Sequence, residues 1–473
     1  MRPLPVAVVG LFCVACLSLA REERPQPIRL HPDNPHYFLW RGKPAVLITS
    51  GEHYGAVLNG DFDYKRYLEA LESYGFNQTR AFSGTYREVA GSFGIEGNTL
   101  APRAEAFLSP WARSDERGAG DGLNKFDLSK WDPGYFGRLR DLVAEAGRRG
   151  VVVKLVLFCT MYDDAVWAVS PMNPANNVNG LGDVGRGEVY SGGNAKLMAF
   201  QEALAAKLAT ELREFDNVYF EICNEPYERG GLTKEWNDRI VGAIVAAEAG
   251  LPAERRHLIA QGFARGEKIE KPNPNVSVFN FHSASADDVA RNYALGRVTA
   301  DDETGGKGSD DLPYRAEAWE FMLAGGGVFS HLDFSFTCAT PAGAEGVTKA
   351  PGGGGAGIRR QLRVLKRFLE SFDFVAMRPD DGVVKAGVPG GGAVRVLARR
   401  GRAYAIYVRG GDHRVTLTLE LPAGRYEGEW VDVKTGERRG SHGFHHGGGA
   451  VELASPWYEE DVALRIVARK KGE

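Results

Sequence analysis

Short apolar runs with β propensity alternate with helical patterns from about residue 37, and this alternation constrains the fold of the 473-residue chain most. Repeated strand and helix units of this kind are typical of an α/β protein with a parallel sheet. The eight candidate strands lie at residues 45–49, 76–81, 151–158, 218–223, 257–261, 276–281, 297–300 and 328–333. They predict a (β/α)8 TIM barrel over residues 27–375.

Local signals support several of the intervening helices. Asp132 is a predicted N-cap with Pro133 at the first helical position, and Gly150 ends the same helix before the third strand. An apolar stripe at helical spacing then recurs before the fourth strand and after the eighth. The last stripe, which would close the ring, consists of Ile358, Leu362, Leu365, Leu369 and Phe372.

The pattern changes after Phe374 to short alternating strands separated by glycine-rich turns. Residues 376–473 are therefore predicted to form a small antiparallel β-sandwich. Because only about six residues connect it to the last barrel helix, we expect it to pack on the flank of the barrel and to support it. Near the beginning of the chain, residues 37–40 and 45–48 flank Arg41-Gly42-Lys43-Pro44 and predict a hairpin that leads into the first strand.

Composition and the first residues of the chain indicate which binding partners and which cellular compartment to expect. A net charge of -3 with 25% charged residues gives no indication of nucleic-acid binding. Residues 4–19 are apolar and end at a small-residue site, so residues 1–20 are predicted to be a signal peptide, with a secreted or periplasmic protein free of the membrane after cleavage. Cys16 as a lipoprotein acceptor is the disfavoured alternative, because Cys13 is a poor residue three places before it.

Three cysteines remain beyond this segment, too few for a disulfide scaffold. Cys159, Cys223 and Cys338 are expected to be buried thiols. If Cys159 and Cys223 end neighbouring strands, a disulfide between them is the alternative.

Two acidic residues follow predicted strands at positions where barrels place their catalytic groups. Glu225 lies in Asn224-Glu225-Pro226, directly after the apolar run 218–223, and Glu303 follows the seventh strand. Two carboxylates brought to one mouth are what glycoside hydrolysis requires. A helix-capping role is the alternative for Glu225. For Glu303, the neighbouring acids Asp301 and Asp302 compete for the position that faces the mouth.

Other polar side chains at strand ends are candidate substrate-binding residues. Arg80 ends the second strand, where it can hold the nucleophile ionised, or else form a buried ion pair. His282 ends the sixth strand, with a satisfied core histidine as its alternative. Weaker candidates are His53, Asp333, the amide of Asn224, and Trp167 in the long segment before the fourth strand.

No cofactor or metal is predicted. His442, His445 and His446 lie among glycines without an accompanying carboxylate or cysteine. Glycines 352–355 lack the lysine and Ser/Thr pattern of a phosphate-binding loop.

With Arg80, Asn224-Glu225-Pro226, His282 and Glu303 at these strand ends, residues 27–375 resemble the clan A glycoside hydrolases, which include the family 5 cellulase-like enzymes. The resemblance implies that Glu225 is the acid/base and Glu303 the nucleophile. The segment from His31 to Tyr54 and the C-terminal sandwich also resemble secreted apiosidase-like barrels. Residues 332–336 lack the tryptophan that many family 5 enzymes have there, so the resemblance does not identify the substrate.

The resemblance and the acid pair together predict a retaining glycoside hydrolase that cleaves the O-glycosidic bonds of a poly- or oligosaccharide. We expect the two carboxylates to lie about 5 Å apart. We also expect burial and the charge of Glu303 to raise the pKa of Glu225. An α-furanosidase and a catalytically inactive carbohydrate-binding barrel are the alternatives.

Overall fold

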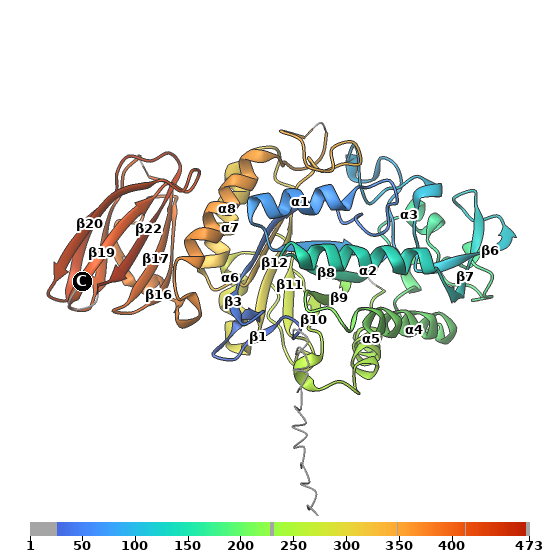
Figure 1. Cartoon of the computed structure of the whole chain (residues 1–473). Coiled ribbons are helices and arrows are strands. Elements are labelled where there is room, and N and C mark those ends of the chain that lie inside the picture. The colour runs from blue at the N-terminus through green and yellow to red at the C-terminus, as the bar shows by residue number, and fades with distance from the viewer. Residues whose placement is uncertain (1–25, 228–230, 348, 412, 470–473) are drawn as a thin grey trace, which may run out of the picture.

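The structure, a computed structural model, describes residues 26–227, 231–347, 349–411 and 413–469. Figure 1 shows a large barrel with a smaller pair of sheets against one side of it.

A ring of eight parallel strands forms the centre of the barrel, in the order β4-β13-β12-β11-β10-β9-β8-β5. The strands are the eight predicted from the sequence, and the (β/α)8 TIM barrel is confirmed. Their bounds are β4 Leu47–Gly51, β5 Gln78–Phe82, β8 Val152–Cys159, β9 Val218–Asn224, β10 Ile259–Gly262, β11 Val278–Phe281, β12 Val298–Thr304 and β13 Val328–Leu332.

A side chain closes the ring between β4 and β5, which share no backbone ladder. The amide of Asn77 donates to the carbonyl of Val46 at 2.8 Å and accepts from the amide of Ile48 at 3.0 Å. The backbone adds one hydrogen bond, from Asn77 N to Ile48 O at 3.5 Å. Asn77 therefore satisfies backbone groups of β4 that a neighbouring strand would otherwise pair.

Helices surround the strands, and their ends follow the predicted signals. In α2, Asp132 accepts hydrogen bonds from the amides of Gly134 and Tyr135. Gly150 adopts φ 72 just beyond the C-cap of that helix. The helices are α1 Tyr64–Tyr74, α2 Pro133–Arg148, α3 Asp164–Val169, α4 Ala195–Leu212, α5 Lys234–Ala247, α6 Ala286–Asn292, α7 Asp311–Leu323 and α8 Ala356–Glu370.

The amino end of the barrel is covered by a three-stranded sheet of β1 Arg29–His31, β2 Asn34–Trp40 and β3 Lys43–Ala45. β2 and β3 form the predicted hairpin, whose turn residues Arg41 and Gly42 both have positive φ, as a two-residue turn requires. Ile28 and Phe38 pack against the first residues of the barrel strands. Substrate access is therefore expected at the opposite, carboxyl end.

The segment between β5 and α2 carries a two-stranded excursion of β6 Trp111–Arg117 and β7 Asn124–Trp131. Short 3-10 helices occupy other connections. They are η1 Ser92–Gly94, η2 Ala104–Ala106, η3 Pro174–Asn176, η4 Arg186–Glu188, η5 Ala253–Arg255, η6 Tyr293–Leu295, η7 Phe374–Ala376 and η8 Asp381–Val383.

Two antiparallel sheets follow the barrel and form the predicted sandwich, with a core of their own. The larger sheet contains β14 Arg378–Pro379, β16 Ala393–Arg399, β17 Ala403–Arg409, β22 Asp461–Ala468, β19 Gly424–Val431 and β20 Arg438–His446. The smaller sheet contains β15 Val384–Ala386, β18 Thr416–Leu421 and β21 Gly449–Ala454.

The larger sheet packs against α7 and α8, which lie between it and the barrel strands (Figure 1). The Trp319 ring of α7 stacks on Tyr407 of β17, with centroids 5.4 Å apart. Arg315 of α7 is 1% exposed and donates two hydrogen bonds of 2.8 Å to the buried carboxylate of Asp461. Aromatic stacking and a buried ion pair together make a fixed interface, with no flexible tether.

The three cysteines are free thiols. Cys159 and Cys223 are buried at the ends of neighbouring strands, as predicted, without a disulfide. The expectation for Cys338 was wrong. This residue is exposed, because it lies beyond β13 in a surface loop and not in a strand.

In the part of the chain that the structure describes, no helix combines the length and the apolar character needed to span a bilayer. The predicted signal peptide, residues 1–20, lies outside the described residues.

We predict that Arg315→Ala lowers the free energy of unfolding by about 3–5 kcal/mol, because it leaves the carboxylate of Asp461 buried without its charged partner. Chemical denaturation measures this change. Arg399→Ala is the matched control, because the Arg399–Asp373 pair also joins the sandwich to the barrel but both side chains are more than half exposed. It should cost less than about 1 kcal/mol. Equal losses in the two variants would contradict the assigned role of Arg315.

Candidate active site

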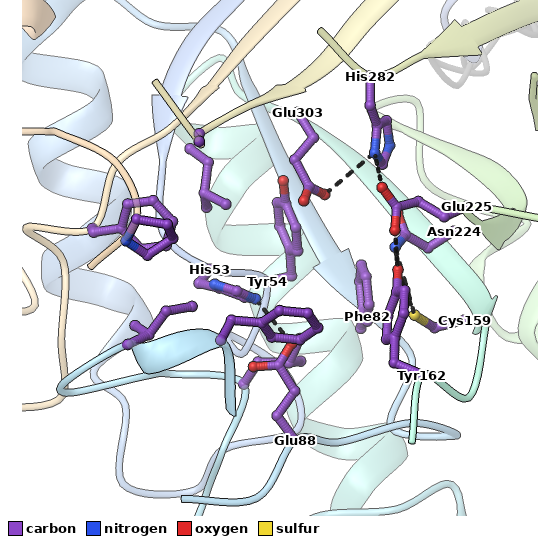
Figure 2. A pocket seen from close by; sticks show the side chains of 18 of the residues that line it. His53, Tyr54, Phe82, Glu88, Cys159, Tyr162, Asn224, Glu225, His282 and Glu303 are labelled. Atoms are coloured by element: carbon purple, nitrogen blue, oxygen red, sulfur yellow. Dashed lines mark hydrogen bonds and ion pairs between the residues drawn. The ribbon is translucent and has the colours of Figure 1, made fainter. Parts of the chain in front are cut away.

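A cavity of about 260 Å³ opens at the carboxyl ends of the barrel strands. Side chains from several strand ends and from the segment after β5 form its walls (Figure 2). They include His53, Tyr54, Phe82, Tyr86, Glu88, Phe93, Cys159, Tyr162, Asn224, Glu225, His282, Glu303 and Phe334. Six of the eight residues predicted for the site lie in this cavity or directly beneath it.

Glu225 and Glu303 face each other across the cavity. Glu225 follows β9, and Glu303 is the second-to-last residue of β12. Their side chains are 22% and 24% exposed. One carboxylate oxygen of Glu225, one of Glu303 and a ring nitrogen of His282 all lie within 4.8 Å of one another.

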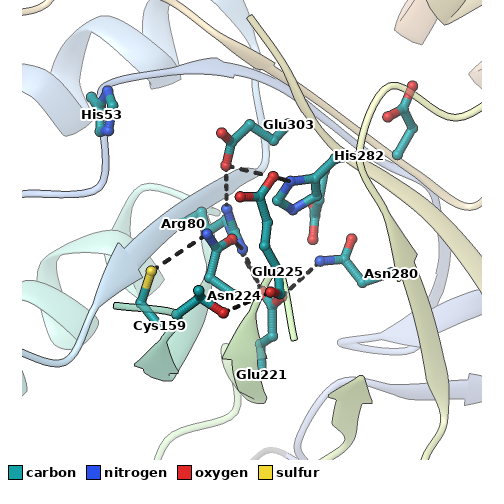
Figure 3. Close-up of polar contacts among 12 residues, drawn as sticks. His53, Arg80, Cys159, Glu221, Asn224, Glu225, Asn280, His282 and Glu303 are labelled. Carbon is teal, nitrogen blue, oxygen red and sulfur yellow. Dashed lines mark hydrogen bonds and ion pairs between the residues drawn. The ribbon is translucent and has the colours of Figure 1, made fainter. Parts of the chain in front are cut away.

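Arg80 joins the two halves of the site from below (Figure 3). Its guanidinium donates to Glu303 Oε2 at 3.0 Å and to Asn224 Oδ1 at 2.6 Å. It also donates twice to Glu221 Oε2, at 3.1 and 2.9 Å, and its side chain is fully buried. Arg80 therefore contacts Glu303 and also forms a buried ion pair with Glu221.

A buried charge network lies under the cavity, inside the barrel. Lys154 of β8 lies 3.0 Å from Glu221 and also pairs with Asp302. Burial lowers the pKa of Lys154 to about 7. Burial would raise the pKa of Glu221, but the charges of Arg80 and Lys154 outweigh it and lower that pKa to about 2.

The three adjacent acids of β12 lie in different surroundings. Asp302 is fully buried against Lys154, and Asp301 is fully buried and accepts a hydrogen bond from the amide of Ala284. Burial, with the charge of Glu317, raises the pKa of Asp301 well above its usual value. Of the three, only Glu303 lines the cavity.

Glu225 is held by two side chains. His282 Nδ1 lies 2.9 Å from Glu225 Oε1, and the hydroxyl of Tyr162 donates to Glu225 Oε2. Asn224 Nδ2 donates to the same hydroxyl at 2.9 Å. Tyr162 was not among the predicted site residues, although its position three residues after β8 is the signal that would have found it.

These contacts contradict the expected protonation of Glu225. Burial raises its pKa, but the hydrogen bond and charge of His282, with the hydrogen bond from Tyr162, outweigh burial and lower it. Burial and the charge of Glu303 alone would raise this pKa, and the two hydrogen-bond partners reverse the direction. The resting site therefore favours an ionised Glu225.

Four residues on the cavity wall have left-handed backbone conformations that non-glycine residues rarely adopt. They are Tyr54 after β4, Phe93 in η1, Glu225 after β9 and Ser283 after β11, with φ of 57, 54, 46 and 49. Such conformations persist where the surrounding structure fixes them, and they concentrate at functional sites. At Glu225 the bend lies directly before Pro226, at the point where the strand ends.

His53 and Glu88 form a second polar pair in the cavity (Figure 2). His53 Nε2 lies 3.2 Å from Glu88 Oε1. Burial lowers the pKa of His53, but the charge of Glu88 outweighs it and the net shift is upward. Glu88 was missed because it lies in the segment after β5, which has no repeating pattern to place its side chains.

Two predicted substrate-binding residues lie away from the cavity. Asp333 is fully buried and its carboxylate bonds to Arg359 at 2.8 Å, to Ser50 and to Ser335, so it fastens β13 to α8. The next residue, Phe334, lines the cavity instead. Trp167, on α3, packs half-buried against the hydrophobic core. A position at or after a strand end did not fix the direction of either side chain.

Glu225, His282 and Glu303 are also the group of potential metal ligands found among the described residues. Acidic groups of this kind are common without an ion. The histidines 442, 445 and 446 lie on β20 and pair through their backbones with β19.

Comparison with known proteins adds a fold and a partial family match. Residues 95–228 match a family described as "Domain of unknown function (DUF6298)". No curated protein matches the chain. A solved structure described as a glycoside hydrolase is similar with a TM-score of 0.63 at 15% identity, covering 94% of this chain and 97% of that one. A glycoside hydrolase family 5 protein from Bacteroides vulgatus has the same TM-score at 14% identity, covering 93% and 94%.

Coverage this high includes the barrel and the sandwich together. The chain therefore has the two-part fold of these solved glycoside hydrolases. At 14% to 15% identity the likeness is one of fold, and the family match spans less than a third of the chain.

We predict that His282→Gln raises the pKa of Glu225, because the variant removes the charged neighbour while burial remains. Carbon NMR titration of the glutamate carboxyl groups measures this pKa, with Glu225→Gln to assign the signal. His53→Gln makes the same change at a histidine that does not contact Glu225 and should leave its titration unchanged. An unshifted midpoint in His282→Gln would show that other groups set this pKa.

Proposed function

We propose that the protein is a retaining O-glycosidase that uses Glu303 as nucleophile and Glu225 as acid/base. The observation that carries this proposal is the spacing of the two carboxylates, whose facing oxygens lie within 4.8 Å of each other. Retaining enzymes hold their carboxyl groups about 5–5.5 Å apart, whereas inverting enzymes need about 6.5–9.5 Å for a water molecule.

In the first step, an oxygen of Glu303 forms a bond to the anomeric carbon while the bond from that carbon to the leaving oxygen breaks. The leaving oxygen takes a proton from Glu225. Arg80 favours this division of roles, because its donated hydrogen bond fixes the position of one oxygen of Glu303. In the second step, Glu225 takes a proton from water, which displaces Glu303 from the sugar.

The proton for the leaving group belongs to the Glu225–His282 pair. Because His282 and Tyr162 lower the pKa of Glu225, this residue rests as a carboxylate and passes a proton on after receiving it across the 2.9 Å contact with His282. The basic limb of the activity profile then reports loss of the proton that reaches the leaving oxygen through Glu225.

Carbohydrate contacts are assigned to the polar residues that line the cavity. His53 and Glu88 can hydrogen-bond sugar hydroxyls on one wall, and Asn224 and His282 on the other. Phe334 lies near the position where a tryptophan was noted as missing, and offers an apolar face. Trp167 and Asp333 have no substrate role in this proposal.

The substrate is proposed to be a poly- or oligosaccharide met outside the cytoplasm, because residues 1–20 have the pattern of a signal peptide. Amino-terminal sequencing of the protein recovered from its host tests this point. A mature chain that begins at Met1 would contradict it.

We predict that hydrolysis retains the anomeric configuration. A panel of aryl glycosides, followed by proton NMR of the first product, identifies both the sugar ring and the stereochemistry. An inverted product would contradict the assignment of Glu303. Turnover of five-membered rings alone would identify an α-furanosidase, and no turnover of any glycoside would indicate a carbohydrate-binding barrel.

We predict different losses for the glutamates of the cavity. Glu303→Gln should lose at least about 10⁴-fold in kcat, because it removes the nucleophile. Glu225→Gln should retain much more activity on aryl glycosides with acidic leaving groups, which need no proton, than on alkyl glycosides. Glu88→Gln, the same change on the opposite wall, should mainly raise KM. If Glu88→Gln loses as much kcat as Glu303→Gln, the pair is assigned wrongly.

A further inference from the structure

A second cavity, of about 510 Å³, lies between α8 of the barrel and the larger sheet of the sandwich. Six cationic side chains line it, and no aspartate or glutamate does. Three of the six come from α8 and three from the sandwich. They are Arg360, Arg363, Arg367, Lys434, Arg438 and Arg465, and together they define the basic cleft.

Among the described residues, no carboxylate lies within 4 Å of the three arginines of α8, although Arg360 is close enough to Asp311 of α7 for its charge to act on that carboxylate and favour a lower pKa there. The ion pairs of this helix are made by other residues, Arg359 with Asp333 and Lys366 with Glu370. Arg360, Arg363 and Arg367 follow one another at spacings of three and four and therefore share one face of the helix. The Nε of Arg363 is buried and has no hydrogen-bond partner.

The opposite wall carries counter-charges of its own, so the unpaired charge of the cleft lies mainly on α8. Arg438 and Arg465 share one carboxylate, that of Glu429, at 2.9 and 3.1 Å. Lys434 pairs with Glu459 at 2.7 Å and with Glu460 at 3.1 Å, and Glu460 also pairs with Arg315. The turn after Lys434 lies against α8. Gly436 in this turn is so near Val364 of α8 that an added Cβ atom would lie 3.3 Å from the valine side chain. The two walls of the cleft are therefore held close together. Cations held together without enough counter-charge repel one another, and an anion between them would relieve that repulsion.

We propose that the basic cleft binds an acidic polysaccharide through its carboxylate groups. The arginines of α8 extend along about 10 Å of the helix at its rise of 1.5 Å per residue, which suits a chain with repeated charges better than one small anion. Guanidinium groups bind carboxylates through two parallel hydrogen bonds. The choice of a carbohydrate among polyanions rests on the proposed function, whereas the site itself is separate from the catalytic cavity.

A nucleic acid fits the basic cleft less well. Proteins that bind single strands stack bases on accessible aromatic rings. The aromatic ring in this lining, Phe368, is only 5% exposed and packs in the hydrophobic core.

The test measures binding of fluorescent oligogalacturonate to the full chain by anisotropy. The cleft variant combines Arg360→Gln, Arg363→Gln and Arg367→Gln. The control variant removes three exposed cations elsewhere, by Arg117→Gln, Arg213→Gln and Lys268→Gln. We expect about tenfold weaker binding in the cleft variant, unchanged binding in the control, and weaker binding of the unmodified protein as salt rises. Both variants should hydrolyse aryl glycosides at the same rate.

Several results would overturn the proposal. They are equal binding by the cleft variant and the unmodified protein, equal losses in the two variants, equal binding of methyl-esterified oligogalacturonate, or tighter binding of dextran sulfate or DNA. Thermal unfolding confirms that both variants are folded. A protein that hydrolyses no glycoside yet binds oligogalacturonate through the cleft would contradict the proposed function and support this inference.

Discussion

The rest of the site depends on the ion pairs and hydrogen bonds of the Arg80 side chain. Its buried guanidinium touches Glu303 from β12, Asn224 and Glu221 from β9, and it lies 4.6 Å from the centre of the Tyr54 ring. A buried cation is stable only when anions and acceptors surround it, so these groups must assemble around Arg80 as the barrel closes. The same contacts that stabilise the guanidinium therefore fix the positions of the cavity residues.

The charges below the cavity extend this constraint into the barrel. Arg80 and Lys154 are matched by Glu221, Asp302 and Glu303, and Asn280 donates to the remaining oxygen of Glu221 at 2.8 Å. An apolar interior would be easier to stabilise, because buried ion pairs rarely add net stability. What the charged interior provides is a fixed electrostatic environment beneath the two facing glutamates.

The sequence was sufficient for the parts that depend on periodicity. All eight strands, the caps of α2 and the change to a sandwich follow from patterns of apolar residues and turn formers. Glu225 and Glu303 were placed at one mouth because parallel strands end on one side. These patterns did not predict the direction in which an individual side chain points. Asp333 bonds to Arg359, and Trp167 packs half-buried against the core.

The residues that were missed depend on contacts between distant segments. Lys154 and Glu221 lie within otherwise apolar strands, and only the ring of strands shows that they face each other. Glu88 lies in a segment without periodicity. The pKa of Glu225 depends on the hydroxyl of Tyr162 and the ring of His282, which are 63 and 57 residues away in the chain.

The junction between β4 and β5, which the side chain of Asn77 closes, has a consequence for how the chain folds. β4 forms its backbone ladder with β13, where Leu47 is the partner of Val328. The next strand in the sequence, β5, is joined to β4 mainly by the side chain of Asn77. During synthesis, β4 has no strand to pair with until nearly the whole barrel has left the ribosome. Pairing across such a sequence separation is slow, because the entropy of closing the loop opposes it. Ring closure is then a late event, and until it occurs β5 through β12 form an open sheet with two unprotected edges.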